Sequence, residues 1–380
     1  MIRVLRRMYR GQTTADFYTQ KKWAVVISGV CLLIAIGSLF TRGLNLGIDF
    51  QGGVAFEVPA KNGFTVETAR EVLSAENLDP SQAKIQVLST ASEDRVRIQL
   101  RDQPADTVEK LQDALVKKAD VQDGDVSVAT VSASWGRSIT TQAVQALLIF
   151  FVIVSMYIAW KFEWRMALGA LASIVHDIVI SVGVYSVLGL EVTPATVVAF
   201  LTIMGYSLYD TMVIFDKMDE NEKRFAGSRT SYGNIVNISM NQVLMRSLNT
   251  NISSILPVIS LYVLGAQVLG AVTLEEFSVA LIVGMIIGTY SSIYVAAPVV
   301  GVLKERTPQY ASKRGEIARG EEMAVLMATG APVSRRVHAR VQGSQSDESA
   351  VGGSVRVTDN AKAAEALLSH PPRPRKKSRK

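Results

Sequence analysis

Six long apolar segments run through this sequence, and each is long enough to cross a hydrocarbon layer of about 30 Å as a helix. Hydrophobic residues make up 48% of the 380 residues, and charged residues make up only 19%. We therefore predict a polytopic α-helical membrane protein. The predicted spans are residues 23–40, 143–160, 167–190, 195–215, 243–264 and 277–303.

A cleaved signal peptide is an alternative interpretation of the first span, because basic residues precede it. The leader is long, however, and the run IAIGSLF offers no convincing small-residue cleavage site. Five further spans also need an anchor of the correct orientation. We therefore expect residues 23–40 to remain in the membrane.

Basic residues predict the orientation, because they collect in cytoplasmic segments. The leader, residues 1–22, has six Lys and Arg against one acidic residue. Residues 41–142 have 11 Lys and Arg against 15 Asp and Glu, a net charge of −4. The pattern predicts a multi-pass protein of the cell membrane, with both termini in the cytoplasm and residues 41–142 outside.

Residues 304–380 form a basic tail, with 16 Lys and Arg against 8 Asp and Glu. Its Ser, Gly, Pro and Arg content predicts a largely disordered cytoplasmic segment, within which residues 315–329 have the composition of a helix. We expect its basic end to meet anionic lipid headgroups. A nucleic acid or the ribosome is the alternative partner, which we do not favour.

The segment outside the membrane alternates between strand and helix patterns. Period-two alternation predicts strands, and helical spacing behind Thr65 or Pro104 predicts two helices. The resulting order βαββαβ predicts an α+β ferredoxin-like domain, with two helices on one face of a four-stranded sheet. The predicted elements are strands 54–58, 84–88, 95–100 and 125–131 and helices 65–76 and 105–118.

Ionisable residues inside three of the apolar spans are the strongest functional signal, because each costs several kcal/mol in hydrocarbon. Asp177, Asp210 and Arg246 lie on polar stripes that must face protein or water rather than lipid. The stripes are Ser173, His176, Asp177 and Ser181; Thr202, Tyr206, Ser207, Asp210 and Thr211; and Arg246, Asn249, Thr250 and Ser253.

Two interpretations of these charges remain open. Asp210 and Arg246 form either a static ion pair that fixes helix packing, or a proton relay in which Asp210 titrates and Arg246 tunes its charge, since arginine keeps its proton. His176 and Asp177 belong either to the relay or to hydrogen bonds between helices. Tyr206, Asn249 and Thr250 share these two alternatives.

Glycine and proline positions indicate packing and a joint. Gly284 and Gly288 have the small-xxx-small spacing of closely packed helices. Pro257 frees backbone carbonyls within its span and predicts a kink. At the outer end of the first span, GIDFQGG places flexible backbone between a helix and a sheet. The residues of that joint are Gly47, Asp49, Gly52 and Gly53.

Several enzyme classes find no support in the sequence. It has no nucleotide-binding loop, no Cys or His spacing typical of a metal site and no Ser/His/Asp arrangement that the topology would bring together. Its single cysteine, Cys31, lies in the first span. We expect no catalytic residue, metal or cofactor, and an energy source other than ATP.

Five motifs between residues 23 and 306 together resemble the SecF family, the smaller half of the bacterial SecDF protein-export complex, in the resistance-nodulation-division superfamily. The pair HD and the run GYSLYDTMVIFDKMDEN resemble the SecF half rather than its partner SecD. The motifs are GIDFQGG at 47–53, HD at 176–177, GYSLYDTMVIFDKMDEN at 205–221, RSLNT at 246–250 and GTYSSIYVAAP at 288–298.

This resemblance implies a six-helix subunit that pairs with SecD and uses the proton-motive force to help unfolded preproteins leave the SecYEG channel. YajC-like and YidC-like subunits follow as further partners. Asp210 and Arg246 correspond to family residues implicated in proton conduction. Two departures affect the surroundings of Asp210: Tyr209 stands where the family has Asn, and KMDEN at 217–221 replaces RIREN.

Two rival functions predict different behaviour. A small-solute or lipid exporter needs a substrate cavity lined by aromatic residues of the outer segment, which offers few beyond Phe56, Phe64 and Trp135. A non-transporting assembly scaffold needs the membrane charges only for packing.

Overall fold

The computed structural model describes residues 13–88, 94–226 and 230–329. The chain divides into two units, Met1–Pro332 and Val333–Lys380, and the second lies outside the described residues. The predictions for residues 1–12 of the leader and for residues 330–380 of the tail therefore lie outside them as well.

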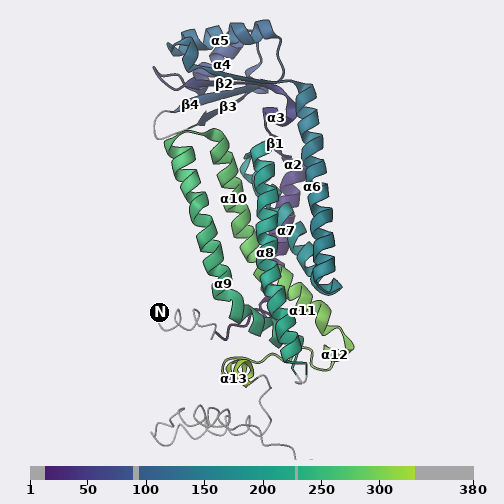
Figure 1. Ribbon diagram of the computed structural model, residues 1–380. Helices are drawn as coiled ribbons and strands as arrows, with labels where there is room; N and C mark the ends of the chain where they lie inside the picture. Colours follow the sequence, from purple (N-terminus) through teal and green to yellow (C-terminus); the bar gives the residue numbers. More distant parts are fainter. Residues whose placement is uncertain (1–12, 89–93, 227–229, 330–380) are drawn as a thin grey trace, which may run out of the picture. The chain divides into compact units, whose positions relative to one another are not determined.

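In the described part of the chain, six helices are long and apolar enough to cross a membrane, which confirms the predicted number (Figure 1). Two of them change their winding and continue in a π-helical segment, labelled η3 or η4. The helices are α2 (Lys21–Thr41), α6 (Ala133–Lys161), α7 (Trp164–Leu188), α8 (Pro194–Arg224), α9 with η3 (Tyr232–Ser260, Leu261–Val268) and α10 with η4 and α11 (Val272–Ser291, Ser292–Ala296, Ala297–Glu305).

Two of these helices begin well before the predicted spans. Helix α6 begins at Ala133, where the hydroxyl of Ser132 accepts the backbone N–H of Trp135 at 3.3 Å. Helix α9 begins at Tyr232 behind a similar cap from Ser231. Hydropathy marks only the apolar part of a helix, so it misses polar turns that extend beyond the hydrocarbon.

Glycines allow the helices to approach closely, as predicted for the GMIIG motif. A Cβ built on Gly284 would lie 2.6 Å from Cγ2 of Ile203, and one on Gly288 would lie 2.9 Å from Cβ of Ser207. Both contacts join α10 to α8, which confirms the packing role of this motif. Gly183 makes the equivalent approach between α7 and α2, where its Cβ would lie 2.7 Å from Cα of Ala35.

Pro257 lies inside α9, four residues before the helix changes to π-helical winding at Leu261. Proline removes one backbone donor and crowds the preceding turn, and π-helical turns are rare and often occur at functional sites. The structure shows a change of winding over Leu261–Val268, and the kink at Pro257 stays a prediction.

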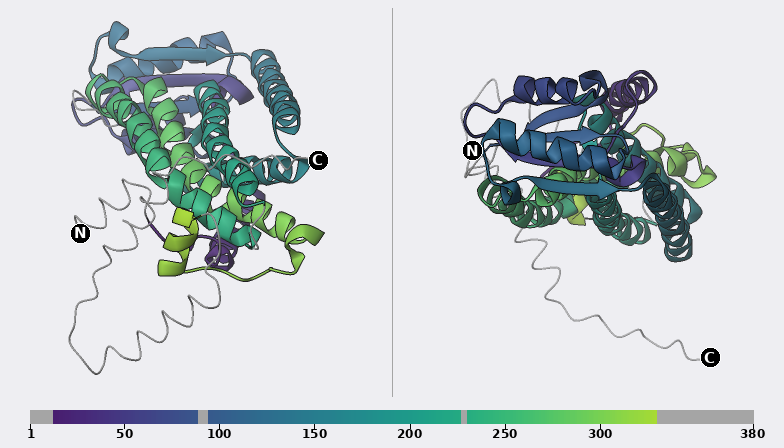
Figure 2. Two further views of the ribbon diagram at one scale, coloured as in Figure 1. Left: turned by 60° about the horizontal axis from the view of Figure 1, so that its bottom comes forward. Right: turned by 90° about the horizontal axis from the view of Figure 1, so that it is seen from above.

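The segment between α2 and α6 folds into the predicted order of strands and helices. Strand β2 lies between β4 and β5 and is antiparallel to both, while β3 pairs with β4 at the edge. Helices α4 and α5 lie across one face of this sheet (Figures 1 and 2). The elements are β2 (Gly53–Pro59), α4 (Val66–Ala75), η1 (Pro80–Gln82), β3 (Lys84–Leu88), β4 (Arg95–Leu100), α5 (Ala105–Ala119), η2 (Asp123–Asp125) and β5 (Ser127–Val131).

Buried apolar side chains between the sheet and its two helices stabilise this segment. Alternate residues of β2 and β4, among them Phe56 and Ile98, face Leu73 of α4 and Leu115 of α5. The hydroxyl of Thr65 accepts the backbone N–H of Thr68 and caps α4, as its position in the sequence predicts.

Three short elements connect the sheet to the membrane helices. Strand β1 (Asn45–Leu46) pairs in parallel with β6 (Glu191–Val192), so the residues after α2 lie beside those after α7. Helix α3 (Ile48–Gln51) then leads into β2.

Asparagines on the polar first half of α9 bind two other segments of the chain. The side chain of Asn237 accepts the backbone N–H of Tyr18 at 2.8 Å, and that of Asn241 accepts the N–H of Ala15 at 3.0 Å. The side chain of Asn234 accepts the N–H of Ala318 at 2.8 Å. We call Asn234, Asn237 and Asn241 the asparagine ladder.

The ladder explains why the start of the predicted tail is structured. Two short helices, α12 (Pro308–Ala311) and α13 (Glu321–Thr329), follow α11, and the backbone at Glu316 and Ala318 is bound to the start of α9. Composition predicted a helix over 315–329, and the structure has it over the shorter range Glu321–Thr329.

The contact between α7 and α2 generates a first prediction. Gly183→Ala adds a methyl group where the backbone of Ala35 already lies, so we expect a loss of about 1–3 kcal/mol of stability from overpacking. Gly37→Ala is the matched control, because a Cβ there has open space. Thermal unfolding in detergent measures both, and equal midpoints for the two variants would contradict the close approach.

Asp16 generates a second prediction. Burial alone would raise its pKa, but hydrogen bonds from Thr19, Asn237 and Arg319 outweigh burial and lower the pKa below its ordinary value. The charged carboxylate therefore stabilises the fold at neutral pH, and this contribution is lost as the pH falls through the ordinary aspartate range to the lowered pKa.

We expect Asp16→Asn to lower the unfolding midpoint near pH 7 and to match wild type below about pH 3. Asp113→Asn, on an exposed position of α5, is the control and should leave the midpoint unchanged at both pH values. A gap between Asp16→Asn and wild type that stays constant with pH would refute the role of this charge.

Candidate functional site

Asp177 is buried within the helix bundle, with 2% of its surface exposed. Its Oδ2 accepts a hydrogen bond from the Ser207 hydroxyl of α8 at 2.7 Å, and its Oδ1 lies 3.2 Å from Nδ1 of His176. The other ring nitrogen of His176 lies 3.2 Å from the hydroxyl of Ser28 on α2. Asp177 and His176 therefore connect α2, α7 and α8.

Asp210 is the second buried carboxylate, with 6% of its surface exposed. Its Oδ2 accepts a hydrogen bond from the hydroxyl of Ser247 on α9 at 2.7 Å. Ser207 and Asp210 lie three residues apart on α8, so within one turn this helix donates to Asp177 of α7 and accepts from Ser247 of α9.

Arg246 lies near Asp210 but is not bonded to it. Among the ion pairs of the described residues there is none between them; Nη2 of Arg246 instead donates to the hydroxyl of Tyr209 at 3.4 Å, and its side chain is exposed. Adjacent helical residues point about 100° apart. Since Ser247 faces Asp210, Arg246 is turned away from it.

A polar cavity of about 320 Å³ lies beside this arginine. Its lining includes Tyr209 and Arg246 together with charged residues at the ends of α6 and α8, among them Lys161, Asp216 and Lys217. Arg246 and Tyr209 therefore line a cavity that also contains charged side chains, whereas the buried Asp210 is not part of its lining.

The structure brings Tyr206 into this site through a residue that the sequence analysis missed. Tyr206 and Thr289 both donate to the side-chain oxygen of Asn251, at 3.1 and 2.7 Å, and the amide of Asn251 donates to the carbonyl of Ser247 at 2.9 Å. Asn251 thus joins α8, α9 and α10. By contrast, the predicted residue Asn249 is exposed.

Thr250 is half-buried, and neither it nor Asn249 contacts Asp210. Polar residues occur at most positions from Arg246 to Ser254, so helical spacing alone offers two candidate faces. Ser247 and Asn251, four residues apart, mark the face that the structure buries. The four-residue spacing of Ser247 and Asn251 is the sequence signal that could have identified the buried face of α9.

The GIDFQGG motif forms a tightly packed junction. The N–H of Gly47 donates to the carbonyl of Val192 at 2.9 Å and extends the pairing of β1 with β6. Gly52 has a φ of 79°, and a Cβ there would lie 2.6 Å from Cα of Ala133. Gly53 likewise has a positive φ and lies against the carbonyl of Leu100. Only glycine fits at either position without displacement of the backbone.

Asp49 of this motif is half-buried at the same junction. Burial raises its pKa; the nearby Arg97 opposes the shift, and Glu191 adds to it. Asp49 therefore stays within the electrostatic reach of both Arg97 of the sheet and Glu191, which follows α7.

Charged residues across the junction were not predicted. The carboxylate of Glu191, after α7, accepts Nζ of Lys84 at 2.6 Å and Nε2 of Gln99 at 2.8 Å. Arg97 lies 3.4 Å from Glu276 at the start of α10. These partners are far apart in the sequence, and no local pattern indicates that they meet.

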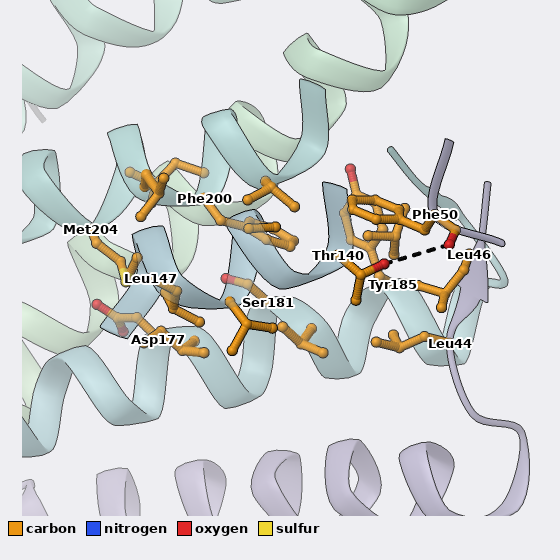
Figure 3. A pocket seen from close by; sticks show the side chains of 18 residues that line it. Leu44, Leu46, Phe50, Thr140, Leu147, Asp177, Ser181, Tyr185, Phe200 and Met204 are labelled. Carbon is orange, nitrogen blue, oxygen red and sulfur yellow. Dashed lines mark hydrogen bonds between the residues drawn. The ribbon is translucent and has the colours of Figure 1, made fainter. Parts of the chain in front are cut away.

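An apolar cavity of about 250 Å³ lies between α6, α7 and α8 (Figure 3). Asp177 lies at one end, and Leu44, Leu46 and Phe50 of the junction lie at the other. Because nearly all of its lining is apolar, this cavity offers few hydrogen-bond partners to water and does not resemble a proton path.

In residues 13–88, 94–226 and 230–329, no group of three or more His, Cys, Asp or Glu is arranged to hold a metal ion. The polar groups of the site are therefore carboxylates, hydroxyls and amides, the His176 ring and the exposed Arg246.

Two family models match the chain. Residues 94–306 match the C-terminal model of the protein export membrane proteins SecD and SecF, and residues 37–63 match the SecD/SecF GG motif. The second match contains the GIDFQGG junction described above.

Individual proteins of the same family are also similar to this chain. The protein translocase subunit SecF of Streptomyces coelicolor is 41% identical over 304 residues, which are 80% of this chain and 80% of that protein. The protein translocase subunit SecDF of Thermus thermophilus is 32% identical over 299 residues, 78% of this chain and 40% of that protein.

The crystal structure of the translocon-associated membrane protein SecDF from Thermus thermophilus has a TM-score of 0.69 and 29% identity to this chain. The match covers 80% of this chain and 42% of the solved chain, so this chain spans less than half of that protein's length. Since a family model covers more than half of the chain and a SecF relative matches over most of its length, the chain belongs to the SecF family of protein translocase subunits.

Proposed function

We propose that this protein is the SecF-like subunit of a Sec translocase accessory complex. It uses the proton-motive force to assist the late release of preproteins from the SecYEG channel, and it performs no catalytic chemistry of its own. Membership of the SecF family supports the role in protein export. The polar network in the membrane supports the use of protons.

One observation carries the proposal: Arg246, Asn249 and Ser253 are exposed on a helix that is apolar enough to span the membrane. A charged side chain facing hydrocarbon costs several kcal/mol. A second protein therefore covers this face of α9. We propose SecD as that partner, because the Thermus thermophilus relative is named SecDF and is more than twice as long as the matched region.

Asp210 is the proton carrier in this proposal, and Arg246 sets its electrostatic surroundings. Arginine keeps its proton at any physiological pH, whereas a carboxylate exchanges one. The hydroxyl of Ser247 donates to the charged form of Asp210. The polar cavity beside Arg246, whose lining includes Lys161 and Asp216, supports proton access from that end of the bundle.

Movement then reaches the outer segment through α8, α7 and the junction. Protonation of Asp210 weakens its bond to Ser247 and allows α8 to shift, and Ser207 passes the shift to Asp177 on α7. The outer end of α7 leads to Glu191, which is bonded to two strands of the sheet.

We propose further that the βαββαβ unit is a ferredoxin-like, extracytoplasmic domain that contacts the emerging preprotein, and that both termini are cytoplasmic. Glu191 and Glu276 lie at the ends of α7 and α10 that meet the sheet. Lys161 and Lys304 lie at the opposite end, in agreement with the distribution of basic residues along the sequence.

The first test is preprotein release from vesicles that contain the chain and its co-purified partner, with an imposed proton gradient and no ATP. We expect Asp210→Asn to lose the gradient-dependent part of release, since the variant cannot exchange a proton. One charge moved across 100 mV supplies about 2.3 kcal/mol, which this variant no longer receives.

Asp219→Asn is the matched control on the same helix, because Asp219 pairs with Lys223 at 2.6 Å and does not line the polar cavity. It should keep gradient-dependent release. Equal release by wild type and Asp210→Asn would favour an assembly scaffold, and gradient-driven movement of a small solute or lipid without preprotein release would favour an exporter.

Glu191 generates a separate prediction about the junction. Glu191→Ala leaves Lys84 and Gln99 without their shared acceptor, so we expect gradient-dependent release to fall severalfold while complex assembly is retained. Glu71→Ala, an exposed residue that pairs with Lys118 on α5, is the control. Unchanged release in Glu191→Ala would remove the junction from the coupling path.

A further inference from the structure

A third cavity, of about 480 Å³, lies between α2 and α11 at the end of the bundle near Lys304. We call it the α2–α11 groove. Its walls come from three helices that are distant in the sequence, and most of the lining is aliphatic. The lining residues are Lys21, Ala24, Val25, Ser28, Gly29, Leu32, Ala172, His176, Tyr294, Val295, Pro298, Val299, Val302, Leu303 and Arg306.

Two basic residues stand among these apolar ones. Nζ of Lys21 lies 3.4 Å from the ring centroid of Tyr18, whose hydroxyl donates to the buried Glu305 at 2.8 Å. Arg306 is exposed directly after α11. In the described part of the chain, neither Lys21 nor Arg306 has a carboxylate within ion-pair distance.

Lys21 begins α2 and Arg306 follows the end of α11, so both lie at the helix ends where the groove meets the membrane surface. Towards the bundle centre, the groove reaches Ser28 and His176, which lie 3.2 Å apart. It is thus an apolar channel with positive charge at its surface end.

The groove also has free space along α2. A Cβ built on Gly29 would meet nothing within 4 Å, in contrast to the close contact of Gly183 with the same helix. The space on this side of α2 is therefore not filled by protein atoms of the described residues, and the neighbouring Val25 is exposed.

We propose that the α2–α11 groove binds one anionic phospholipid. Lys21 and Arg306 donate hydrogen bonds to the phosphate and attract the negative headgroup. One acyl chain lies between Val25 and Val302 and ends near Ser28. The basic residues at the surface complement the charge of the headgroup, and the apolar walls below them suit an acyl chain. Free phosphate would contact only the basic residues.

The bound chain also contacts the polar network. Ser28 lines the groove and lies within hydrogen-bond distance of His176 and of Tyr290, at 3.2 and 3.1 Å. A lipid in the groove therefore shields these bonds from the surrounding bilayer and holds α2 against α7 and η4. Under the proposed orientation it belongs to the cytoplasmic leaflet, but the binding itself does not depend on proton transport.

The test is native mass spectrometry of the complex with its partner, released from nanodiscs that contain equal amounts of phosphatidylglycerol and phosphatidylcholine. We expect wild type to retain phosphatidylglycerol preferentially. Lys21→Gln combined with Arg306→Gln should reduce that preference roughly tenfold to thirtyfold, since each basic side chain near the surface contributes about 1 kcal/mol. The control is Lys22→Gln combined with Lys161→Gln, which removes the same charge outside the groove.

A steric variant separates the acyl chain from the headgroup. Gly29→Leu places a side chain in the groove, where a Cβ at this position meets nothing within 4 Å, and Gly37→Leu places the same side chain at an equally open position of α2 outside the groove. We expect Gly29→Leu, and not Gly37→Leu, to lose the retained lipid.

Three outcomes would overturn the proposal. Equal retention in Gly29→Leu and Gly37→Leu would show that no chain occupies the groove. Equal preference in the two double variants would show that Lys21 and Arg306 do not select the headgroup. Absence of any preference in wild type would show that something other than an anionic lipid covers the groove.

Discussion

A carboxylate within an apolar helix needs a hydrogen-bond donor, and helix α8 connects the two buried aspartates Asp177 and Asp210. Ser207 of α8 donates to Asp177, and Asp210 of α8 accepts from Ser247. A hydrogen bond to a charged group contributes about 1.5–3 kcal/mol to stability. Without its donor, the buried carboxylate lies in apolar surroundings with no hydrogen bond to offset the cost of burial. Rotation of α8 therefore disturbs Asp177 and Asp210 together, and the packing of α7, α8 and α9 is coupled to their charge.

The same helix is held on a third side by glycine contacts. Gly284 and Gly288 of α10 lie against Ile203 and Ser207, so α8 has little space to tilt towards α10. On its exposed side lies Tyr209. In the proposed mechanism, a change in the charge of Asp210 is thus transmitted along α8 rather than absorbed by loose packing.

Much of the fold follows from the sequence, because its signals are local. Alternation in RVRIQL, the cap at Thr65 and the long apolar runs each depend on residues close together in the chain. The polar starts of α6 and α9 were missed because hydropathy does not register a helix outside hydrocarbon. The start of the predicted tail is ordered because Asn234 binds its backbone, a contact across 84 positions.

The site was predictable only in part, because its contacts join residues that lie far apart in the sequence. Asp177 and Asp210 stand out because charge is rare in such helices. Their actual partners, Ser207 and Ser247, are common membrane residues, and only the rotation of each helix decides which of several hydroxyls meets the carboxylate. Arg246 looked like the partner of Asp210 by charge, yet the neighbouring Ser247 occupies that position.

The contacts of the asparagine ladder form in an order that is set by the synthesis of the chain. Asn237 and Asn241 bind residues 15–18, which leave the ribosome before α9, whereas Asn234 binds residue 318, which leaves it only after α11 is complete. This end of the bundle therefore closes in two steps, and the amide of Asn234 lacks these partners while the last span is being inserted.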